Sequence, residues 1–187
     1  MTKKMSKSEK ELDESHRWAV KNGRPHDAQR DRVYKFDSMV LGASNREDWS
    51  MTQCQEFVNY VWHCYFGNNS VPPYLYDGRG RACAAANGEK MYVPRWARNR
   101  SIILHELSHA ILSRWSQYAY NFKMEAHGPE FVRMHAEIQG ALGNWATVTF
   151  VKLAKAYGLR VANKGKVPTF EDEVQPHLRK ESWHSRC

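Results

Sequence analysis

The stretch that decides the fold is Ile102-Ile103-Leu104-His105-Glu106-Leu107-Ser108-His109-Ala110-Ile111-Leu112. In a helix, His105 and His109 lie one turn apart on the same face, so both imidazoles can bind one metal ion. Glu106 follows the first histidine, where its carboxylate can reach a water molecule on the metal without being a ligand itself. This H-E-x-x-H pattern is typical of zinc hydrolases that use the glutamate as a general base.

Apolar residues surround the motif on most sides, which predicts a largely buried helix over residues 98–115. Two histidines and a glutamate inside such a helix are costly unless something satisfies their polar atoms. A metal ion does so. The alternative is a core helix whose histidines hydrogen-bond to the backbone.

A third ligand is needed, and His127 in His127-Gly128-Pro129-Glu130-Phe131 is the candidate. Pro129 suits the first turn of a helix, which places His127 at the entrance of that helix. Three protein ligands would leave the fourth metal position open, as in catalytic zinc sites. Other H-E-x-x-H enzymes use a glutamate instead, so the rival third ligands are Glu125, Glu130 and Glu137.

H-E-x-x-H followed after a short loop by H-G-P-E-F resembles the SprT-like metallopeptidases, the group that includes Spartan. Just before the helix, Val93-Pro94-Arg95-Trp96-Ala97 is similar to the V-P-x-W-A segment of uncharacterised metallohydrolases from actinobacteria and their viruses. The resemblance covers roughly residues 27–161. It departs at the C-terminus, where SprT-like proteins often carry a four-cysteine zinc ribbon that this sequence lacks.

The resemblance implies Zn²⁺ held by His105, His109 and His127, with Glu106 as the catalytic base and a polypeptide as substrate. It also implies action on DNA-associated proteins and a cytoplasmic location in a bacterium or a phage-infected host cell.

We predict an α+β fold with a zincin-like core, about five helices and a small three-stranded, mainly antiparallel sheet. Helical periodicity and caps place helices over 28–41, from Asp48 or Ser50 to Gly67, over the metal motif, from Pro129 and over 144–157. Asp27 is a candidate helix cap. Short apolar runs at 71–76, 82–86 and 90–93 predict strands, and Asn87-Gly88 predicts a hairpin between the last two.

The domain spans 27–161 in this interpretation, between a charged segment (1–26) and a polar tail (162–187) that we expect to be flexible.

The net charge of the 187 residues is +8, and basic residues gather before the metal motif. Residues 79–100 contain six basic side chains and one acidic one, a local charge of +5. Two interpretations stay open: a solvated face, or a rim that binds DNA or a DNA-bound protein. The arginines concerned are Arg79, Arg81, Arg95, Arg98 and Arg100.

The four cysteines form no C-x-x-C pair, which favours a reducing compartment over a zinc ribbon or a redox motif. Cys54 and Cys64 are predicted to be small core residues. No apolar run is long enough to cross a bilayer, and no apolar stretch follows the N-terminal lysines, so we expect no membrane partner.

The sequence therefore predicts a zinc-dependent metallopeptidase in which Glu106 assists the attack of zinc-bound water on an amide bond. The aromatic residues of the following loop, Tyr118, Tyr120 and Phe122, either cover the cleft or include a tyrosine that stabilises the oxyanion. One alternative is a zinc-stabilised nucleic-acid or protein binding module without catalysis. Another is hydrolysis of a substrate other than a peptide.

Overall fold

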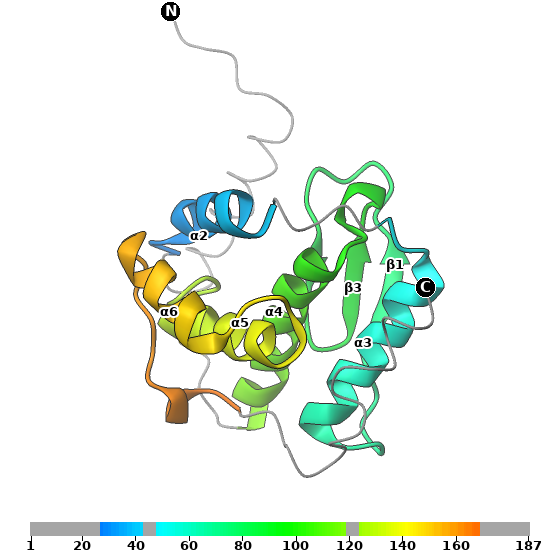
Figure 1. Ribbon diagram of the computed structural model, residues 1–187. Coiled ribbons are helices and arrows are strands. Elements are labelled where there is room, and N and C mark those ends of the chain that lie inside the picture. The colour runs from blue at the N-terminus through cyan, green and yellow to red at the C-terminus, as the bar shows by residue number, and fades with distance from the viewer. Residues whose placement is uncertain (1–26, 43–47, 119–123, 169–187) are drawn as a thin grey trace, which may run out of the picture.

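The computed structural model describes residues 27–42, 48–118 and 124–168 (Figure 1). The first half of the described chain contains α2 (Arg30–Phe36), the π-helical turn η1 (Asp37–Leu41), α3 (Met51–Phe66) and strands β1 (Tyr74–Asp77), β2 (Ala85–Ala86) and β3 (Lys90–Val93). The second half contains η3 (Arg95–Ala97), α4 (Arg100–Tyr118), α5 (Pro129–Leu142), α6 (Thr147–Ala156) and η4 (Lys164–Lys166). The predicted α+β class, with five α-helices in the described residues and a three-stranded sheet, is confirmed.

The sheet is mixed, with the strand order β1-β3-β2. β2 and β3 form the antiparallel hairpin that Asn87-Gly88 predicted, and the Asn87 amide donates to the Lys90 carbonyl at 2.9 Å. β1, however, runs parallel to β3 over four residue pairs, from Tyr74↔Lys90 to Asp77↔Val93. The prediction of a mainly antiparallel sheet was therefore wrong, because a turn signal reports only the hairpin next to it and says nothing of a more distant pairing.

The chain makes a tight turn directly after β1, before it crosses to β2 on the other side of β3. A Cβ on Gly78 would lie 2.7 Å from the ring of Pro94, so only glycine fits beside the end of β3. The Arg81 amide donates to the Gly78 carbonyl at 2.9 Å, and Gly80 has a φ of 80°. Both glycines thus belong to a tight turn that other residues would not form as readily.

Helix α4 lies at the centre of the fold, between the sheet and α5 (Figure 1). The apolar side chains of α4 fill the core on several sides of the helix. The buried polar residues His105 and Glu106 therefore lie in an otherwise apolar interior. The fully buried apolar members of α4 are Ile103, Leu104, Leu107, Ala110 and Ile111. Helix α3 packs on α4 and β1, and a capping box between Ser50 and Gln53 fixes its start.

The N-terminal helix α2 turns its buried Val33 and Phe36 into the core and then continues as a single π-helical turn. Such turns are rare and frequently occur at functional sites. Here the turn begins at Asp37, whose carboxylate accepts a hydrogen bond from His105, one of the predicted metal ligands.

The C-terminal part of the described chain packs against the rest of the fold beyond residue 161, where we predicted the domain to end. Ala162 donates from its amide to the Pro129 carbonyl at 3.0 Å, and Val167 belongs to the hydrophobic core. Residues 162–167 of the predicted tail thus make contacts with the rest of the described chain. The charged segment 1–26 and the rest of the tail, 169–187, lie outside the described residues.

Cys54 and Cys64 are buried in α3, as predicted, and Cys83 is exposed. None of the described helices combines the length and the apolar content that spanning a membrane requires.

Candidate metal centre

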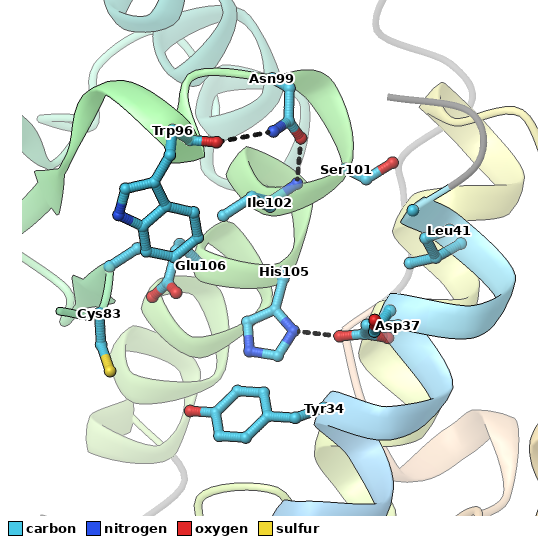
Figure 2. Close-up of a pocket in the computed structure, with 13 residues that line it drawn as sticks. Tyr34, Asp37, Leu41, Cys83, Trp96, Asn99, Ser101, Ile102, His105 and Glu106 are labelled. Carbon is cyan, nitrogen blue, oxygen red and sulfur yellow. Dashed lines mark hydrogen bonds and ion pairs between the residues drawn. The ribbon is translucent and has the colours of Figure 1, made fainter. Parts of the chain in front are cut away.

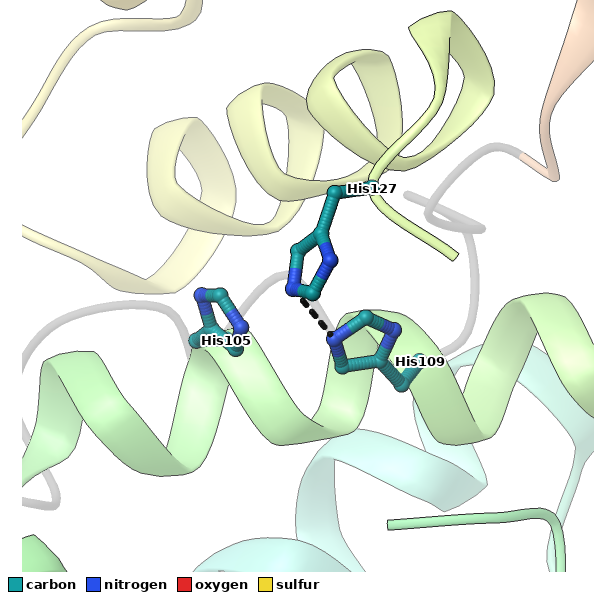
Figure 3. A group of neighbouring side chains, drawn as sticks. All are labelled: His105, His109 and His127. Carbon is teal, nitrogen blue, oxygen red and sulfur yellow. Dashed lines mark hydrogen bonds between the residues drawn. The ribbon is translucent and has the colours of Figure 1, made fainter. Parts of the chain in front are cut away.

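The three predicted ligands meet at one place. Helix α4 presents His105 and His109 one turn apart, with ring centroids separated by 5.0 Å. His127 comes from the turn before α5, and its ring faces both of them (Figure 3). The centroid of His127 lies 5.4 Å from that of His105 and 4.7 Å from that of His109.

The nitrogen atoms have the spacing that a shared metal ion requires. One ring nitrogen of each histidine lies within 4.8 Å of the others. The Nε2 atoms of His109 and His127 are 3.2 Å apart. Two nitrogen ligands at ~2.0–2.1 Å from a tetrahedral zinc ion would be separated by ~3.3–3.4 Å. This pair is therefore already close to ligand geometry.

The third nitrogen supplies an independent test of the fit. His105 Nε2 is buried and has no hydrogen-bond partner among the described residues. Leaving a buried polar atom unsatisfied costs about 1–3 kcal/mol. A metal ion held between the three rings would satisfy this atom, so the donor set fits a metal such as zinc.

Two aspartates orient the histidines. His105 Nδ1 donates to Asp37 Oδ2 at 2.7 Å, and His127 Nδ1 donates to Asp27 Oδ2 at 2.7 Å (Figure 2 shows the first). A proton on Nδ1 leaves the Nε2 lone pair free for a metal. In each case the carboxylate therefore selects the tautomer that the metal needs.

Asp27 is thus a partner of His127 and not the helix cap that its position predicted. Its second oxygen accepts from the His127 backbone amide at 3.1 Å, and no side-chain cap bond is made at α2. Nearby, the buried Gln29 donates to the His127 carbonyl at 2.7 Å and accepts from the Arg160 amide at 2.9 Å. The segment before α2 consequently holds the turn that carries His127.

We expect replacement of Asp27 by asparagine to weaken zinc binding by roughly 10- to 100-fold, the usual effect of losing a carboxylate partner of a histidine ligand. Asparagine removes the negative charge, and its amide nitrogen cannot accept the Nδ1 proton of His127. Competition with a chromophoric chelator measures the affinity. Asp31→Asn is the matched control, because Asp31 is exposed on α2 and, among the described residues, pairs with its neighbour Arg30 and not with a histidine. Equal affinities in the two variants would remove the role assigned to Asp27.

The environment favours neutral imidazoles at two ligands. Burial, together with the neighbouring histidines, lowers the pKa of His109 well below its usual value. Burial also lowers the pKa of His127, although the hydrogen bond that His127 donates to Asp27 acts in the opposite direction. For His105, burial lowers the pKa, but the bond and charge of Asp37 outweigh it and raise the pKa overall. Neutral imidazole is the form that binds metal.

Glu106 lies beside His105 and faces a pocket of about 500 Å³ (Figure 2). It is buried, and this burial raises the pKa of its carboxyl to about 7, with Asp37 adding to the effect and His105 opposing it. A carboxyl group whose pKa is close to neutrality can both accept and return a proton. Of the predicted ligands and the base, only His105 and Glu106 line this pocket.

Phe131 forms the apolar support of the cluster. Its ring stacks on His109 at 4.3 Å between centroids and lies 4.9 Å from both His105 and His127. In the sequence, Phe131 stood out only as the last residue of the His127-Gly128-Pro129-Glu130-Phe131 segment. Its packing restricts the rotation of all three imidazoles.

A second group with metal-ligand chemistry, which the sequence did not reveal, contains Asp37, His105 and His135. Gln139 lies 3.2 Å from His135 Nε2, and His135 Nδ1 lies 3.8 Å from Asp37 Oδ1. Asp37 and His105 are already joined by the 2.7 Å hydrogen bond, which leaves no room for an ion between them. We therefore interpret His135 as a support of Asp37 and not as a ligand.

The rival ligands do not join the cluster. Glu125 pairs with Arg160 at 2.7 Å and Glu137 pairs with Arg133 at 3.3 Å. Within the described ranges, Glu130 belongs to neither group that could hold a metal.

Comparison with protein-family models, curated proteins and solved structures found no match. The resemblance to SprT-like metallopeptidases thus stays a prediction, carried by the motif residues and by the site geometry.

The predicted basic rim is largely occupied by internal pairs. Asp77 pairs with Arg98 at 3.0 Å and with Arg79 at 3.3 Å, and Asp48 pairs with Arg95 at 3.4 Å. Arg81 stacks on Tyr92 at 3.8 Å, and the buried Nε of Arg100 lies near Trp49. The side chains of Arg79 and Arg95 nevertheless remain 91% and 83% exposed, and exposed ion pairs are weak, so the contact with DNA stays a prediction.

The predictions for the aromatic loop are not addressed, because the side chain of Tyr118 and the whole of residues 119–123 lie outside the described part of the chain.

Proposed function

We propose that this chain is a zinc-dependent metallohydrolase of the SprT-like type, most suited to cleaving amide bonds in polypeptides. The observation that carries the proposal is that the imidazoles of His105, His109 and His127 lie close enough to share one ion. The buried Nε2 of His105 has no hydrogen-bond partner among the described residues, and the buried Glu106 follows His105 in the helix. Zinc, when bound there, supplies a Lewis acid that lowers the pKa of a coordinated water toward 7.

The residues of the chain have separate roles in the proposed reaction. His105, His109 and His127 hold the ion through Nε2, while Asp37 and Asp27 keep two of the rings in the required tautomer. Glu106 accepts the proton of the attacking water and returns it to the leaving amine. The low polarity around Glu106 strengthens these electrostatic effects.

A polypeptide substrate is favoured by the position of β2. This strand is at an edge of the sheet, and the residues just before it, Cys83 and Ala84, line the pocket that contains Glu106. An extended peptide can bind such an edge through backbone hydrogen bonds. It would then run past the proposed base.

The alternative is a zinc-stabilised nucleic-acid or protein binding module without catalysis. A structural zinc site normally has four protein ligands, whereas this group has three among the described residues. A DNA contact through the five predicted arginines is compatible with either function, because Arg79 and Arg95 stay exposed although they pair with aspartates. The site therefore supports catalysis better than the module.

The test is incubation of the zinc-loaded full chain with a reduced, alkylated and thus unfolded protein, followed by mass spectrometry of the products. We expect new peptide termini that vanish with a chelator and return when zinc is added back. Stoichiometric zinc without any cleavage of peptides, esters or amides would favour the binding module instead.

A further inference from the structure

The pocket beside Glu106 has walls from three separated parts of the chain (Figure 2). Tyr34 and Leu41 come from α2 and η1, Cys83 and Ala84 precede β2, and the segment from η3 into α4 contributes Trp96, Asn99 and Ile102. Its volume of about 500 Å³ lies in the range of roughly 300–1,000 Å³ that is usual for ligand pockets.

The walls are mainly apolar. Leu41, Ala84 and Ile102 contribute carbon surface, and the rings of Tyr34 and Trp96 stand on different sides of the pocket (Figure 2). Both rings remain unusually accessible for aromatic side chains, since Tyr34 is 46% and Trp96 is 57% exposed. A large apolar surface left open beside a reactive carboxylate is a feature of binding sites.

Two of the polar side chains in the wall are already engaged. Asn99 accepts from the Ile102 amide at 3.1 Å and donates to the Trp96 carbonyl at 3.4 Å. Asp37 is bonded to His105. Among the residues that the structure describes, the lining contains no lysine or arginine, whereas it does contain Asp37 and Glu106. In this described part of the wall, an acidic side chain would therefore meet two carboxyl groups and, apart from a metal ion at His105, no counter-charge.

The pocket lies directly beside the residues proposed to carry out the reaction. Ile102, His105 and Glu106 lie on one face of α4, so a side chain resting on Ile102 holds its own backbone next to the ligand and the base. Binding at this point would orient the amide for attack.

We propose that this pocket binds a large apolar side chain, aromatic or leucine-like, of the residue adjacent to the cleaved amide, and that it discriminates against acidic side chains. The inference rests on the proposed hydrolase function, because it makes the pocket the site that selects the substrate.

The experiment uses amino-acid hydroxamates, whose metal-binding group anchors them at the zinc. Three probes carry a benzyl, a methyl or a carboxymethyl side chain, and calorimetry with the zinc-loaded full chain measures their affinities. Burying a benzyl group is expected to strengthen binding roughly 10- to 100-fold relative to methyl. The carboxymethyl probe is expected to bind no more tightly than methyl.

Two variants and one control test whether the preference for the benzyl probe arises in this pocket. Trp96→Ala removes an exposed wall and should reduce the benzyl preference by at least about 5-fold. Ile102→Trp fills the pocket and should weaken the benzyl probe while sparing the methyl probe, and thermal melting shows whether this variant is folded. Tyr74→Ala, which removes a ring that is 62% exposed and lies outside the pocket, should leave all affinities unchanged.

A second readout does not depend on turnover. Cys83 is exposed and lines the pocket, so the benzyl probe should slow its alkylation, measured on the Cys83 peptide by mass spectrometry. Equal affinities for benzyl and methyl, a preference for carboxymethyl, or an unaltered preference in Trp96→Ala would each overturn the proposal. Peptide cleavage without side-chain preference would refute the pocket assignment alone, whereas benzyl selectivity without any cleavage would refute the hydrolase alone.

Discussion

Replacing Glu106 by glutamine is expected to lower kcat roughly 1,000-fold, within the range of about 10²–10⁴ for loss of a general acid–base. Glutamine has nearly the same shape, but its amide cannot accept a proton from water. Because Glu106 is not a ligand in this account, the zinc content should be unchanged. The measurements are steady-state kinetics on an unfolded protein substrate and metal analysis of the same preparation.

Glu56→Gln is the matched control, since Glu56 is an exposed glutamate on a different helix, α3. It should keep full activity and full zinc content. If Glu106→Gln kept the wild-type rate, Glu106 would not be the base. If it lost zinc together with activity, the glutamate would be part of the ligand set.

Removal of zinc is expected to lower the melting temperature by roughly 10 °C. With free zinc at about 1,000 times its dissociation constant, binding adds about 4 kcal/mol to the free energy of unfolding, and about 1 kcal/mol corresponds to roughly 2–4 °C in a chain of this size. The structural reason is the unsatisfied Nε2 of His105 among packed imidazoles. Calorimetric melting with and without a chelator measures the difference.

His63→Ala serves as the control here, because His63 lies on α3 near the Ser70 carbonyl at 3.3 Å and outside both histidine groups. It should respond to the chelator like the wild type. His127→Ala should melt at the same temperature with and without the chelator. A wild-type melting temperature that ignores zinc and chelator alike would contradict a metal centre in the core.

The local part of this site could be predicted from the sequence. The spacing of His105 and His109, and the Gly128-Pro129 entrance to α5, are properties of neighbouring residues, and the structure places all three histidines together. The capping box at Ser50 and the hairpin at Asn87-Gly88 were predictable for the same reason.

The parts that could not be predicted depend on contacts between distant segments. Asp27 and His127 are 100 positions apart, and Asp37 and His105 are 68 positions apart. Asp37 follows the buried Phe36 at the point where α2 continues as the π-helical turn. One chemical rule could have pointed to Asp27 and Asp37. A histidine that binds a metal usually donates its other ring N–H to a carboxylate or a carbonyl group, so any aspartate in the sequence was a candidate partner.

His135 was missed because its position on α5 matches the apolar periodicity of a core residue. It is indeed buried, and burial lowers its pKa to about 4, which keeps the ring neutral near pH 7. The parallel pairing of β1 with β3 was missed because no local pattern encodes it.

The most direct test of the central claim compares the zinc content of the wild type with that of His127→Ala and His135→Ala after exhaustive dialysis. If His105, His109 and His127 hold the ion, the wild type and His135→Ala should each retain about one zinc per chain, while His127→Ala should retain less than about 0.1. Full zinc in His127→Ala, or loss of zinc in His135→Ala alone, would place the metal elsewhere and contradict the account.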